Sequence, residues 1–295
     1  MNLARYPAQE PLSALGEAYQ QRILALGTDQ TGIEVDYGPD PYQSLTVFRP
    51  DRPRGEVLVF FHGGGWTNGC KEWMFFMAPA LLQEGVTFVS AGYRLAPAHV
   101  FPAGLDDCAD AVTWVERHAS RHGGDPDRIF VGGHSAGGHY AALLAVSSAW
   151  RTARGLPVDV LKGCLPVSGV YQFGDESGMA VRPRFLGSRA PDAVAQGDDR
   201  AEAAAAPLAQ LEPAACPPFL LTRGGRDFPH LIGQADRMAA ALDAAGVPVQ
   251  QEILADCDHF EASIACGQQG GAWASRAADW MRATPRHAGL RVDRP

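Results

Sequence analysis

Apolar residues follow two different spacings along this chain. Short segments with the continuous or alternating apolar pattern of β-strands cover residues 33–37, 44–48, 57–61, 86–90, 128–131, 163–167, 217–222 and 249–254. Between them, apolar residues recur at the three- and four-residue spacing of an α-helix over residues 72–83, 103–121, 140–145, 231–245 and 272–281. Because strands and helices alternate, the pattern predicts an α/β fold with a mostly parallel, doubly wound central sheet of about eight strands and helices on both faces.

The first three strand segments differ in polarity. Residues 33–37 and 44–48 alternate between apolar and polar positions, whereas Val57 to Phe61 is apolar throughout. Alternation is typical of strands with one solvent-exposed face, and continuous apolar runs are typical of strands covered on both faces. We therefore expect an antiparallel hairpin at one edge of the sheet and a central strand at 57–61.

The alternation of strands and helices does not extend over the whole chain. Residues 1–32 carry apolar side chains at loose helical spacing and are expected to form an N-terminal helical arm or partial cap. Residues 33–285 are expected to form a single α/β domain, since such domains often reach about 250 residues. Within it, residues 172–212 are rich in Gly, Arg, Asp and Ala and predict an insertion over the top edge of the sheet, while residues 286–295 predict a frayed tail.

Composition and charge exclude several classes of function. The 295-residue chain is 46% hydrophobic and 20% charged, as in ordinary soluble globular proteins. Its net charge of −8, without a run of lysines or arginines, argues against a nucleic-acid partner. No apolar run approaches the roughly 18 residues of a membrane span, and residues 1–10 lack the apolar core of an export signal. We therefore expect a cytoplasmic protein without membrane contact.

Residues of the types that bind metals occur in unsuitable settings. The six cysteines are scattered without a C-x-x-C pair, which argues against a zinc cluster and a disulfide framework. Asp106, Asp107 and Asp110 fall near the start of a predicted helix, where the helix dipole stabilises carboxylates. His118 and His122 are four residues apart at a polar helix end without a third ligand nearby. The sequence therefore predicts no metal and no cofactor.

The pattern G-x-S-x-G occurs at Gly133 to Gly137, centred on Ser135. A predicted strand precedes it and an alanine-rich predicted helix follows it, which is the setting of a nucleophile elbow. Glycines two residues before and two after the serine let strand and helix approach closely. A serine held in this turn presents its hydroxyl at the top of the sheet, where it is free to attack.

A serine hydroxyl is a weak nucleophile at neutral pH and needs a base that is oriented by a carboxylate. His259 follows the last predicted strand and is the candidate base. Asp227 follows the strand before that and is the candidate carboxylate, in the chain order Ser, Asp, His that a nucleophile elbow requires. Asp256 and Asp258 are alternatives, but both lie too close to His259 along the chain to reach its ring easily, and loop capping explains them.

A glycine-rich loop, His62 to Trp66, follows the central strand directly. Consecutive glycines pack poorly and lose much backbone entropy on folding, so their use is to leave backbone N–H groups open. Attack on a carbonyl creates an oxyanion that needs such donors, and losing one costs roughly 3 kcal/mol. We expect the N–H groups of Gly64, Gly65 and Ala136 to form this oxyanion hole, close to the triad, because the carboxyl ends of parallel strands meet at one edge.

Four segments together resemble a known family, and they are His62 to Trp66, Gly92 to Pro97, Phe101 to Ala103 and Gly133 to Gly138. Over roughly residues 33–266 the chain is similar to the α/β-hydrolase esterases related to hormone-sensitive lipase. His134 stands where those enzymes usually have aspartate, and with the H-G-G-x-W sequence it is similar to arylformamidase (kynurenine formamidase) and its carboxylesterase relatives. The resemblance implies an α/β-hydrolase fold whose triad is Ser135, Asp227 and His259, with Gly64, Gly65 and Ala136 around the oxyanion.

The function predicted by these features is that of a cofactor-independent serine hydrolase. Ser135 would form an acyl-enzyme with a small carboxylic ester, an aryl formamide or another activated amide, and His259 would activate the water that releases the acyl group. Aromatic walls such as Trp66 and Tyr171 would suit an aryl leaving group. Substrate preference is expected to depend on residues 1–32 and 172–212.

Two other interpretations use the same residues. A carbamate or aryl-amide hydrolase could operate with the same triad. A non-catalytic ligand-binding protein of the same fold is disfavoured, because Ser135, Asp227 and His259 are all present. The expected partner is a small-molecule ester or amide, and a homodimer is compatible with the resemblance because relatives often pair.

Overall fold

The computed structural model describes residues 1–173, 181–188 and 200–285. Two parts of the predicted insertion (174–180 and 189–199) and the predicted tail (286–295) lie outside the described residues.

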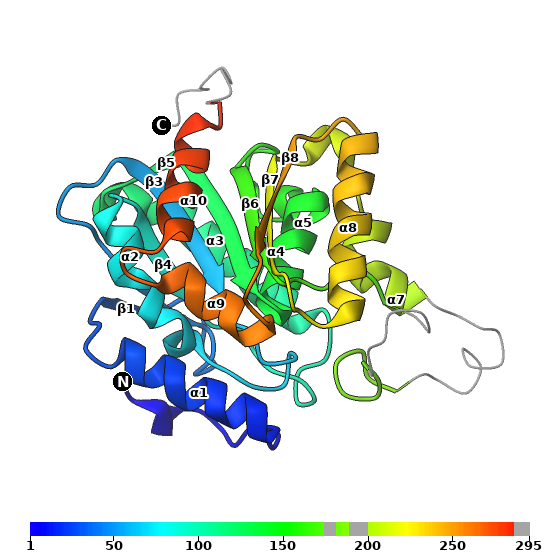
Figure 1. Ribbon diagram of the computed structural model, residues 1–295, viewed down its shortest axis with the longest axis horizontal. Coiled ribbons are helices and arrows are strands. Elements are labelled where there is room, and N and C mark those ends of the chain that lie inside the picture. Colours follow the sequence, from blue (N-terminus) through cyan, green and yellow to red (C-terminus); the bar gives the residue numbers. More distant parts are fainter. Residues whose placement is uncertain (174–180, 189–199, 286–295) are drawn as a thin grey trace.

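An eight-stranded sheet runs through the described part of the chain, in the order β1-β2-β4-β3-β5-β6-β7-β8 (Figure 1). β1 pairs antiparallel with β2, and β2 with β4, while the remaining neighbours are parallel. The strands are β1 (Ile33–Asp36), β2 (Ser44–Phe48), β3 (Gly55–Phe61), β4 (Thr87–Ala91), β5 (Gly124–His134), β6 (Leu161–Val167), β7 (Phe219–Gly224) and β8 (Val249–Leu254). Both the mostly parallel sheet and its antiparallel edge hairpin are confirmed.

Helices cover both faces of this sheet (Figure 1). The α-helices of the described residues are α1 (Ala14–Gly27), α2 (Ala78–Gln83), α3 (Ala103–His118), α4 (Ala136–Val146), α5 (Ala149–Ala153), α7 (Arg200–Ala205), α8 (Pro229–Ala244), α9 (His259–Gly267) and α10 (Ala272–Ala283). Side chains alternate along β3, so Val57, Val59 and Phe61 join the core under α3, α4 and α8, while Leu58 and Phe60 join the core under α2, α9 and α10.

Two predicted helices are divided in the structure. The predicted helix at 72–83 is a 3₁₀-helix, Lys71–Met77, followed by α2, whose first turn contains Pro79. Proline is favoured at that position because its missing N–H would have no partner in the first turn. The N-terminal helical pattern is a short 3₁₀-helix, Leu3–Arg5, and then α1, which begins after Ser13 because the Ser13 side chain accepts a hydrogen bond from the first turn.

The N-terminal helix α1 lies apart from the helices that flank the sheet, at the lower edge of the molecule in Figure 1. Its buried residues Tyr19 and Ile23 belong to the same core as Trp73, whose ring meets the Tyr19 ring edge-on at 5.8 Å. The Tyr19 hydroxyl also reaches the ring of His134, the last residue of β5. The helix therefore packs across the carboxyl end of the sheet.

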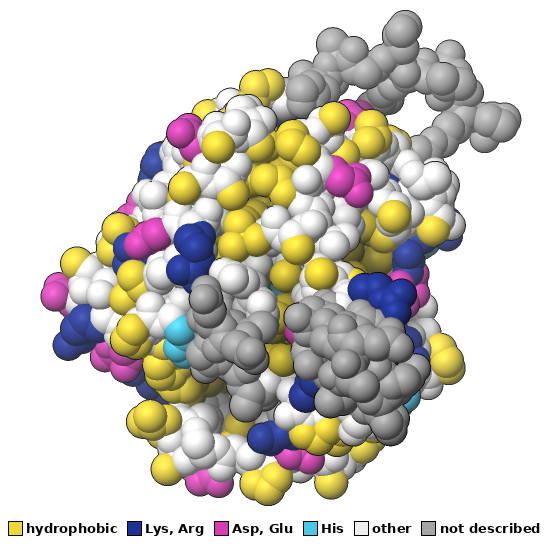
Figure 2. All heavy atoms as spheres, turned by 90° about the vertical axis from the view of Figure 1, so that its right-hand side faces the viewer, with side chains coloured by type: hydrophobic (Ala, Val, Ile, Leu, Met, Phe, Trp, Pro, Cys, Tyr) yellow, Lys and Arg dark blue, Asp and Glu magenta, His cyan; other side chains and the backbone are white. Residues whose placement is uncertain are grey.

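The surface carries charges of both signs. On the face in Figure 2, lysines and arginines are interspersed with acidic residues around a strip of apolar side chains, and they do not gather into a basic stripe. Within the described residues, none of the helices combines the length and the apolar character that crossing a membrane requires.

Candidate active site

Ser135 lies in a strained turn between β5 and α4. Its backbone has φ 53° and ψ −115°, a conformation that residues with side chains rarely adopt. The Ser135 N–H donates to the carbonyl oxygen of Val167 at the end of β6, across 2.9 Å. This bond fixes the turn against the neighbouring strand, so the strain is held by tertiary contacts.

The glycines on either side of Ser135 are required by close backbone packing. A Cβ atom on Gly133 would lie 2.3 Å from the carbonyl carbon of Gly137, and one on Gly137 would lie 2.1 Å from the carbonyl oxygen of Phe61. No side chain can be accommodated at such distances. The G-x-S-x-G pattern therefore reflects the contact of the elbow with β3 as well as the turn itself.

Ser135, His259 and Asp227 form one hydrogen-bonded line. Ser135 Oγ lies 3.0 Å from His259 Nε2, and His259 Nδ1 lies 2.9 Å from Asp227 Oδ1. The three residues follow the ends of β5, β8 and β7, which predicts that they lie in one region, and the structure brings them into contact. Such a line can move a proton from a serine hydroxyl to a histidine that a carboxylate orients.

The carboxylate of Asp227 is fully enclosed and accepts several hydrogen bonds. Besides His259, its Oδ1 accepts from the Phe228 N–H at 2.7 Å, and its Oδ2 accepts from Ser168 Oγ at 2.5 Å. Burial alone would raise the pKa of Asp227, but the hydrogen bonds and the charge of His259 outweigh it and lower the pKa to about 2. Asp227 is therefore ionised at neutral pH.

His259 is the first residue of helix α9, where the sequence predicted a loop. Asp258 caps this helix, because its Oδ1 accepts from the N–H groups of Phe260 and Glu261 at 2.9 and 2.8 Å, while the Glu261 side chain accepts from the Asp258 N–H. The sequence signal for this helix start is the D-x-x-E pattern of a capping box at Asp258 and Glu261. Asp258 is thus occupied as a helix cap, and it is Asp227 that contacts His259.

The glycine-rich loop lies beside the elbow. A Cβ atom on Gly63 would lie 3.3 Å from the Ser135 Cβ. Gly64, Gly65 and Trp66 all have positive φ, at 113°, 61° and 65°, and the Asn68 N–H closes the turn by donating to the Gly64 carbonyl oxygen at 2.9 Å. Within the described part of the chain, the N–H groups of Gly64 and Gly65 donate no backbone hydrogen bond, as an oxyanion hole requires.

The N-terminal arm holds this loop from outside. Gln9 pairs with the Gly69 backbone, since its Oε1 accepts from the Gly69 N–H and its Nε2 donates to the Gly69 carbonyl oxygen, both at 2.8 Å. Asn68 Nδ2 donates to the Glu10 carbonyl oxygen at 2.5 Å, and the Glu10 carboxylate pairs with Arg184 at 3.2 Å. Residues 9 and 10 thus connect the glycine-rich loop with the predicted insertion.

Trp66 and Tyr171, the predicted aromatic walls, are buried. The Trp66 ring stacks on Phe185 at 4.2 Å and donates from Nε1 to His139 Nδ1 at 3.1 Å. The Tyr171 ring is enclosed next to Gly169, and the Tyr171 backbone N–H donates to Gln234 Oε1 at 2.7 Å. Their contact with a substrate stays a prediction.

Phe228 is an exposed aromatic residue beside His259 that no sequence pattern singled out. Its side chain is 42% exposed, and its ring centroid lies 4.8 Å from that of His259. The ring also stacks on His230 at 5.8 Å with an interplanar angle of 8°. The position directly after the candidate acid was the signal that could have pointed to it.

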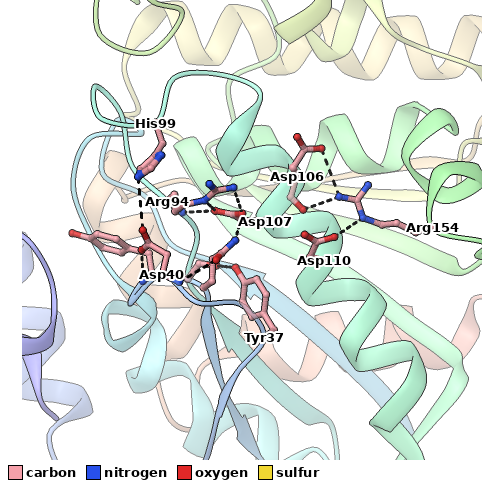
Figure 3. A network of polar contacts seen from close by, with 11 residues as sticks. Tyr37, Asp40, Arg94, His99, Asp106, Asp107, Asp110 and Arg154 are labelled. Carbon is pink, nitrogen blue, oxygen red and sulfur yellow. Dashed lines mark hydrogen bonds and ion pairs between the residues drawn. The ribbon is translucent and has the colours of Figure 1, made fainter.

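The three aspartates near the start of α3 bind arginines (Figure 3). Asp107 is fully buried and accepts from Arg94 Nε and Nη2 at 2.8 and 2.7 Å. Asp106 and Asp110 pair with Arg154 at 3.6 and 2.7 Å. They connect α3 to the loop after β4 and to the end of α5.

His118 and His122 both pack against the Trp114 side chain. Their rings lie 4.5 and 5.7 Å from the Trp114 ring, and His118 Nδ1 also lies 2.7 Å from the Trp114 carbonyl oxygen. Among the described residues, no group of three or more histidine, cysteine or acidic side chains is arranged to hold a metal ion.

Comparison with known proteins gives a family match over most of the chain. A family model described as alpha/beta hydrolase fold matches residues 58–262. The carboxylesterase NlhH of Mycobacterium tuberculosis is 46% identical over 90 residues, which are 30% of this chain and 28% of that protein. The esterase LipC of the same organism is 32% identical over 225 residues, 71% of this chain and 54% of LipC. The matches thus span only about a quarter and about half of these two relatives.

Kynurenine formamidase of Danio rerio is 28% identical over 240 residues, which are 80% of this chain and 77% of that protein. Among solved structures, a hyperthermophilic esterase from the archaeon Pyrobaculum calidifontis superposes with a TM-score of 0.71 at 24% identity, over 91% of this chain and 93% of that one. At that identity the structural likeness concerns the fold alone.

Proposed function

The chain belongs to the α/β-hydrolase fold family, and from that membership we propose that it is a serine hydrolase that cleaves a small carboxylic ester or an aryl formamide through an acyl-enzyme on Ser135. The observation that carries this proposal is the hydrogen-bonded line from Ser135 Oγ through His259 to Asp227. A line of this kind at the carboxyl edge of a parallel sheet suits acyl transfer.

The direction of the hydrogen bonds suits proton transfer from serine. Asp227 is ionised and can only accept, so His259 Nδ1 carries the proton of the 2.9 Å bond. In neutral His259, Nε2 then has a free lone pair, which accepts from the Ser135 hydroxyl. This is the tautomer that a general base for Ser135 needs.

In acylation, Ser135 Oγ attacks the substrate carbonyl carbon while His259 Nε2 takes the hydroxyl proton. The carbonyl oxygen becomes an oxyanion, for which Gly64, Gly65 and Ala136 are the proposed N–H donors. The intermediate collapses when His259 returns the proton to the leaving oxygen or nitrogen, which breaks the bond between the acyl group and the leaving group.

In deacylation, a water molecule attacks the acyl carbon and gives its proton to His259 Nε2. The proton then passes to Ser135 Oγ as the acid leaves, so the enzyme returns to its starting state. The Asp227 carboxylate stabilises the imidazolium that His259 forms in both halves of the reaction.

Two features favour planar leaving groups. His259 protonates the leaving atom, so that group must lie near His259, and the partly exposed Phe228 ring lies 4.8 Å from the His259 ring. The similarity to a kynurenine formamidase points in the same direction, since that name describes an aryl formamide substrate. The similarity to carboxylesterase NlhH and esterase LipC supports ester substrates equally, so both classes belong to the proposal.

A substrate panel tests this proposal. Purified wild type and Ser135→Ala are assayed on p-nitrophenyl acetate, butyrate and octanoate, on N-formylkynurenine and on a p-nitrophenyl carbamate. We expect turnover of an ester or of the formamide by wild type and its loss in Ser135→Ala. A steep fall after acetate together with turnover of N-formylkynurenine identifies a formamidase, whereas turnover of longer esters identifies a carboxylesterase. Failure on every compound, or activity that survives Ser135→Ala, overturns the proposal.

A further inference from the structure

His134 connects the candidate base to the N-terminal arm. It is the last residue of β5 and directly precedes Ser135, and its side chain is only 1% exposed. His134 Nε2 lies 3.0 Å from the backbone carbonyl oxygen of His259, and the two rings lie 4.7 Å apart. The residue thus contacts both the elbow and the start of α9.

The protonation state of His134 determines which atom is the donor in its hydrogen bond with the His259 carbonyl oxygen. Burial, and then repulsion from His259, lower the pKa of His134 to about 3, so the ring is neutral and carries one N–H. A carbonyl oxygen only accepts, so that N–H is at Nε2 and points to His259. Nδ1 is left with a lone pair, and the Tyr19 hydroxyl lies 3.5 Å from it.

The chain of contacts continues into α9. The Tyr19 hydroxyl lies 2.8 Å from Ser263 Oγ. If Tyr19 donates its proton toward His134, then Ser263 donates to Tyr19, and the side-chain contacts among these three residues are consistent in direction. Ser263 is four residues after His259, on the same side of α9. The pair Tyr19 and His134 therefore contacts the first turns of α9 at two points.

Apolar contacts hold Tyr19 in place. Its ring lies 5.0 Å from the Phe260 ring and 5.8 Å from the Trp73 ring, and the side chain is buried. Since Phe260 directly follows His259, Tyr19 packs on the same helical turn that its hydroxyl contacts. Helix α1, more than 100 residues before the elbow in the sequence, thus forms one wall of the space in which that turn sits.

Resting on the proposed function, we infer that Tyr19 and His134 are positioning residues that hold the backbone of His259 so that its Nε2 stays within hydrogen-bond reach of Ser135. The Asp227 bond orients the His259 ring only at Nδ1. A shift of the first turn of α9 by about 1 Å would separate Nε2 from Ser135 Oγ, and misplacements of that size lower catalysis by up to about 100-fold.

Four variants of the full-length chain test the inference. Tyr19→Phe removes only the hydroxyl, and His134→Met removes the donor to the His259 carbonyl. His134→Gln is the rescue variant, because its amide can again donate. Tyr37→Phe is the matched control, since its hydroxyl donates to the Gly92 carbonyl oxygen at 2.7 Å, away from the triad. Each variant is titrated to completion with a fluorophosphonate, and kcat and KM for p-nitrophenyl acetate are expressed per titrated site.

We expect kcat per titrated site to fall about 3- to 10-fold in Tyr19→Phe and about 10-fold or more in His134→Met, with KM within about twofold, as the loss of one or two buried hydrogen bonds implies. His134→Gln should recover to within about threefold of wild type, and Tyr37→Phe should match wild type. A merely structural role would lower the titratable fraction and leave kcat per site unchanged.

Tyr19→Phe with wild-type kcat per site overturns the inference, and so does an equal loss in Tyr37→Phe. If His134→Met fails to fold, Tyr19→Phe against Tyr37→Phe decides alone. A wild-type protein that hydrolyses neither an ester nor N-formylkynurenine and does not react with the fluorophosphonate overturns the proposed function and this inference with it. Normal wild-type turnover with unaffected variants overturns the inference alone.

Discussion

The Ser168 hydroxyl donates to Asp227 Oδ2 across 2.5 Å, at the ends of the neighbouring strands β6 and β7. Ser168 has a positive φ of 51°, and its N–H donates to the Thr222 carbonyl oxygen at 2.8 Å. The backbone conformation that places this hydroxyl is therefore fixed by β7. Asp227 Oδ1 accepts from His259 and from the Phe228 N–H, so both oxygens of the Asp227 carboxylate accept hydrogen bonds.

Ser168→Ala is expected to lower kcat/KM about 3- to 10-fold at neutral pH. The substitution removes a hydrogen bond to a buried charge, which raises the pKa of Asp227 from its present value of about 2 and frees the carboxylate to turn away from His259. Steady-state kinetics on p-nitrophenyl acetate measure the effect. Ser148→Ala is the control, because Ser148 donates to Glu212 at 2.6 Å in an exposed pair. Equal kinetics in Ser168→Ala and wild type would show that Asp227 needs no second partner.

Phe228→Ala is expected to discriminate between leaving groups. If the exposed ring contacts a planar leaving group beside His259, kcat/KM for p-nitrophenyl acetate should fall about fivefold, whereas that for ethyl acetate should change little. The ratio of the two values is the measurement. Ile253→Ala removes another exposed apolar side chain, on β8, and should leave the ratio unchanged. A ratio that stays constant in Phe228→Ala would contradict this contact.

We expect the protein to lose stability in mild acid because three of its histidines are buried and uncharged. Burial lowers the pKa values of His62 and His139 to about 4, and burial with the charge of His259 lowers that of His134 to about 3, from 6.5. Below pH 6.5 these histidines bind protons in the unfolded chain but not in the folded chain. The free energy of unfolding therefore decreases as the pH falls below 6.5. At pH 5, each histidine lowers the free energy of unfolding by up to about 2 kcal/mol relative to neutral pH.

Urea unfolding at pH 8, 7 and 5 measures this effect. The free energy of unfolding should be nearly constant between pH 8 and 7, where these histidines are neutral in both states, and should fall by several kcal/mol between pH 7 and 5. His139→Gln should reduce the fall by about a third. A free energy of unfolding that does not decrease down to pH 5 would mean that these rings are protonated in the folded protein.

The parts of the candidate site that could be predicted from the sequence are those that local patterns encode. Ser135 lies between two glycines whose spacing reflects backbone contact, and Asp227 and His259 follow strands that an apolar run marks. The order of strands and helices then brings their ends to one edge of the sheet. These three residues could be predicted from the sequence because their positions depend mainly on the fold class.

The residues that contact the candidate triad from other elements could not be predicted in the same way. Ser168 reaches Asp227 from another strand, and Tyr19 reaches His134 across 115 positions, so neither contact has a local signature. Trp66 and Tyr171, the predicted aromatic walls, are buried, whereas the aromatic ring of Phe228 beside His259 stays exposed, and side-chain packing decides this difference. Distances between distant segments are set by the packed core rather than by sequence spacing.

Labelling with a fluorophosphonate followed by peptide mass spectrometry determines whether Ser135 is the nucleophile. We expect one covalent adduct, on the peptide that contains Ser135, with activity lost in proportion to labelling and neither label nor activity in Ser135→Ala. An adduct on a different residue, or ester hydrolysis that persists in Ser135→Ala, would contradict it.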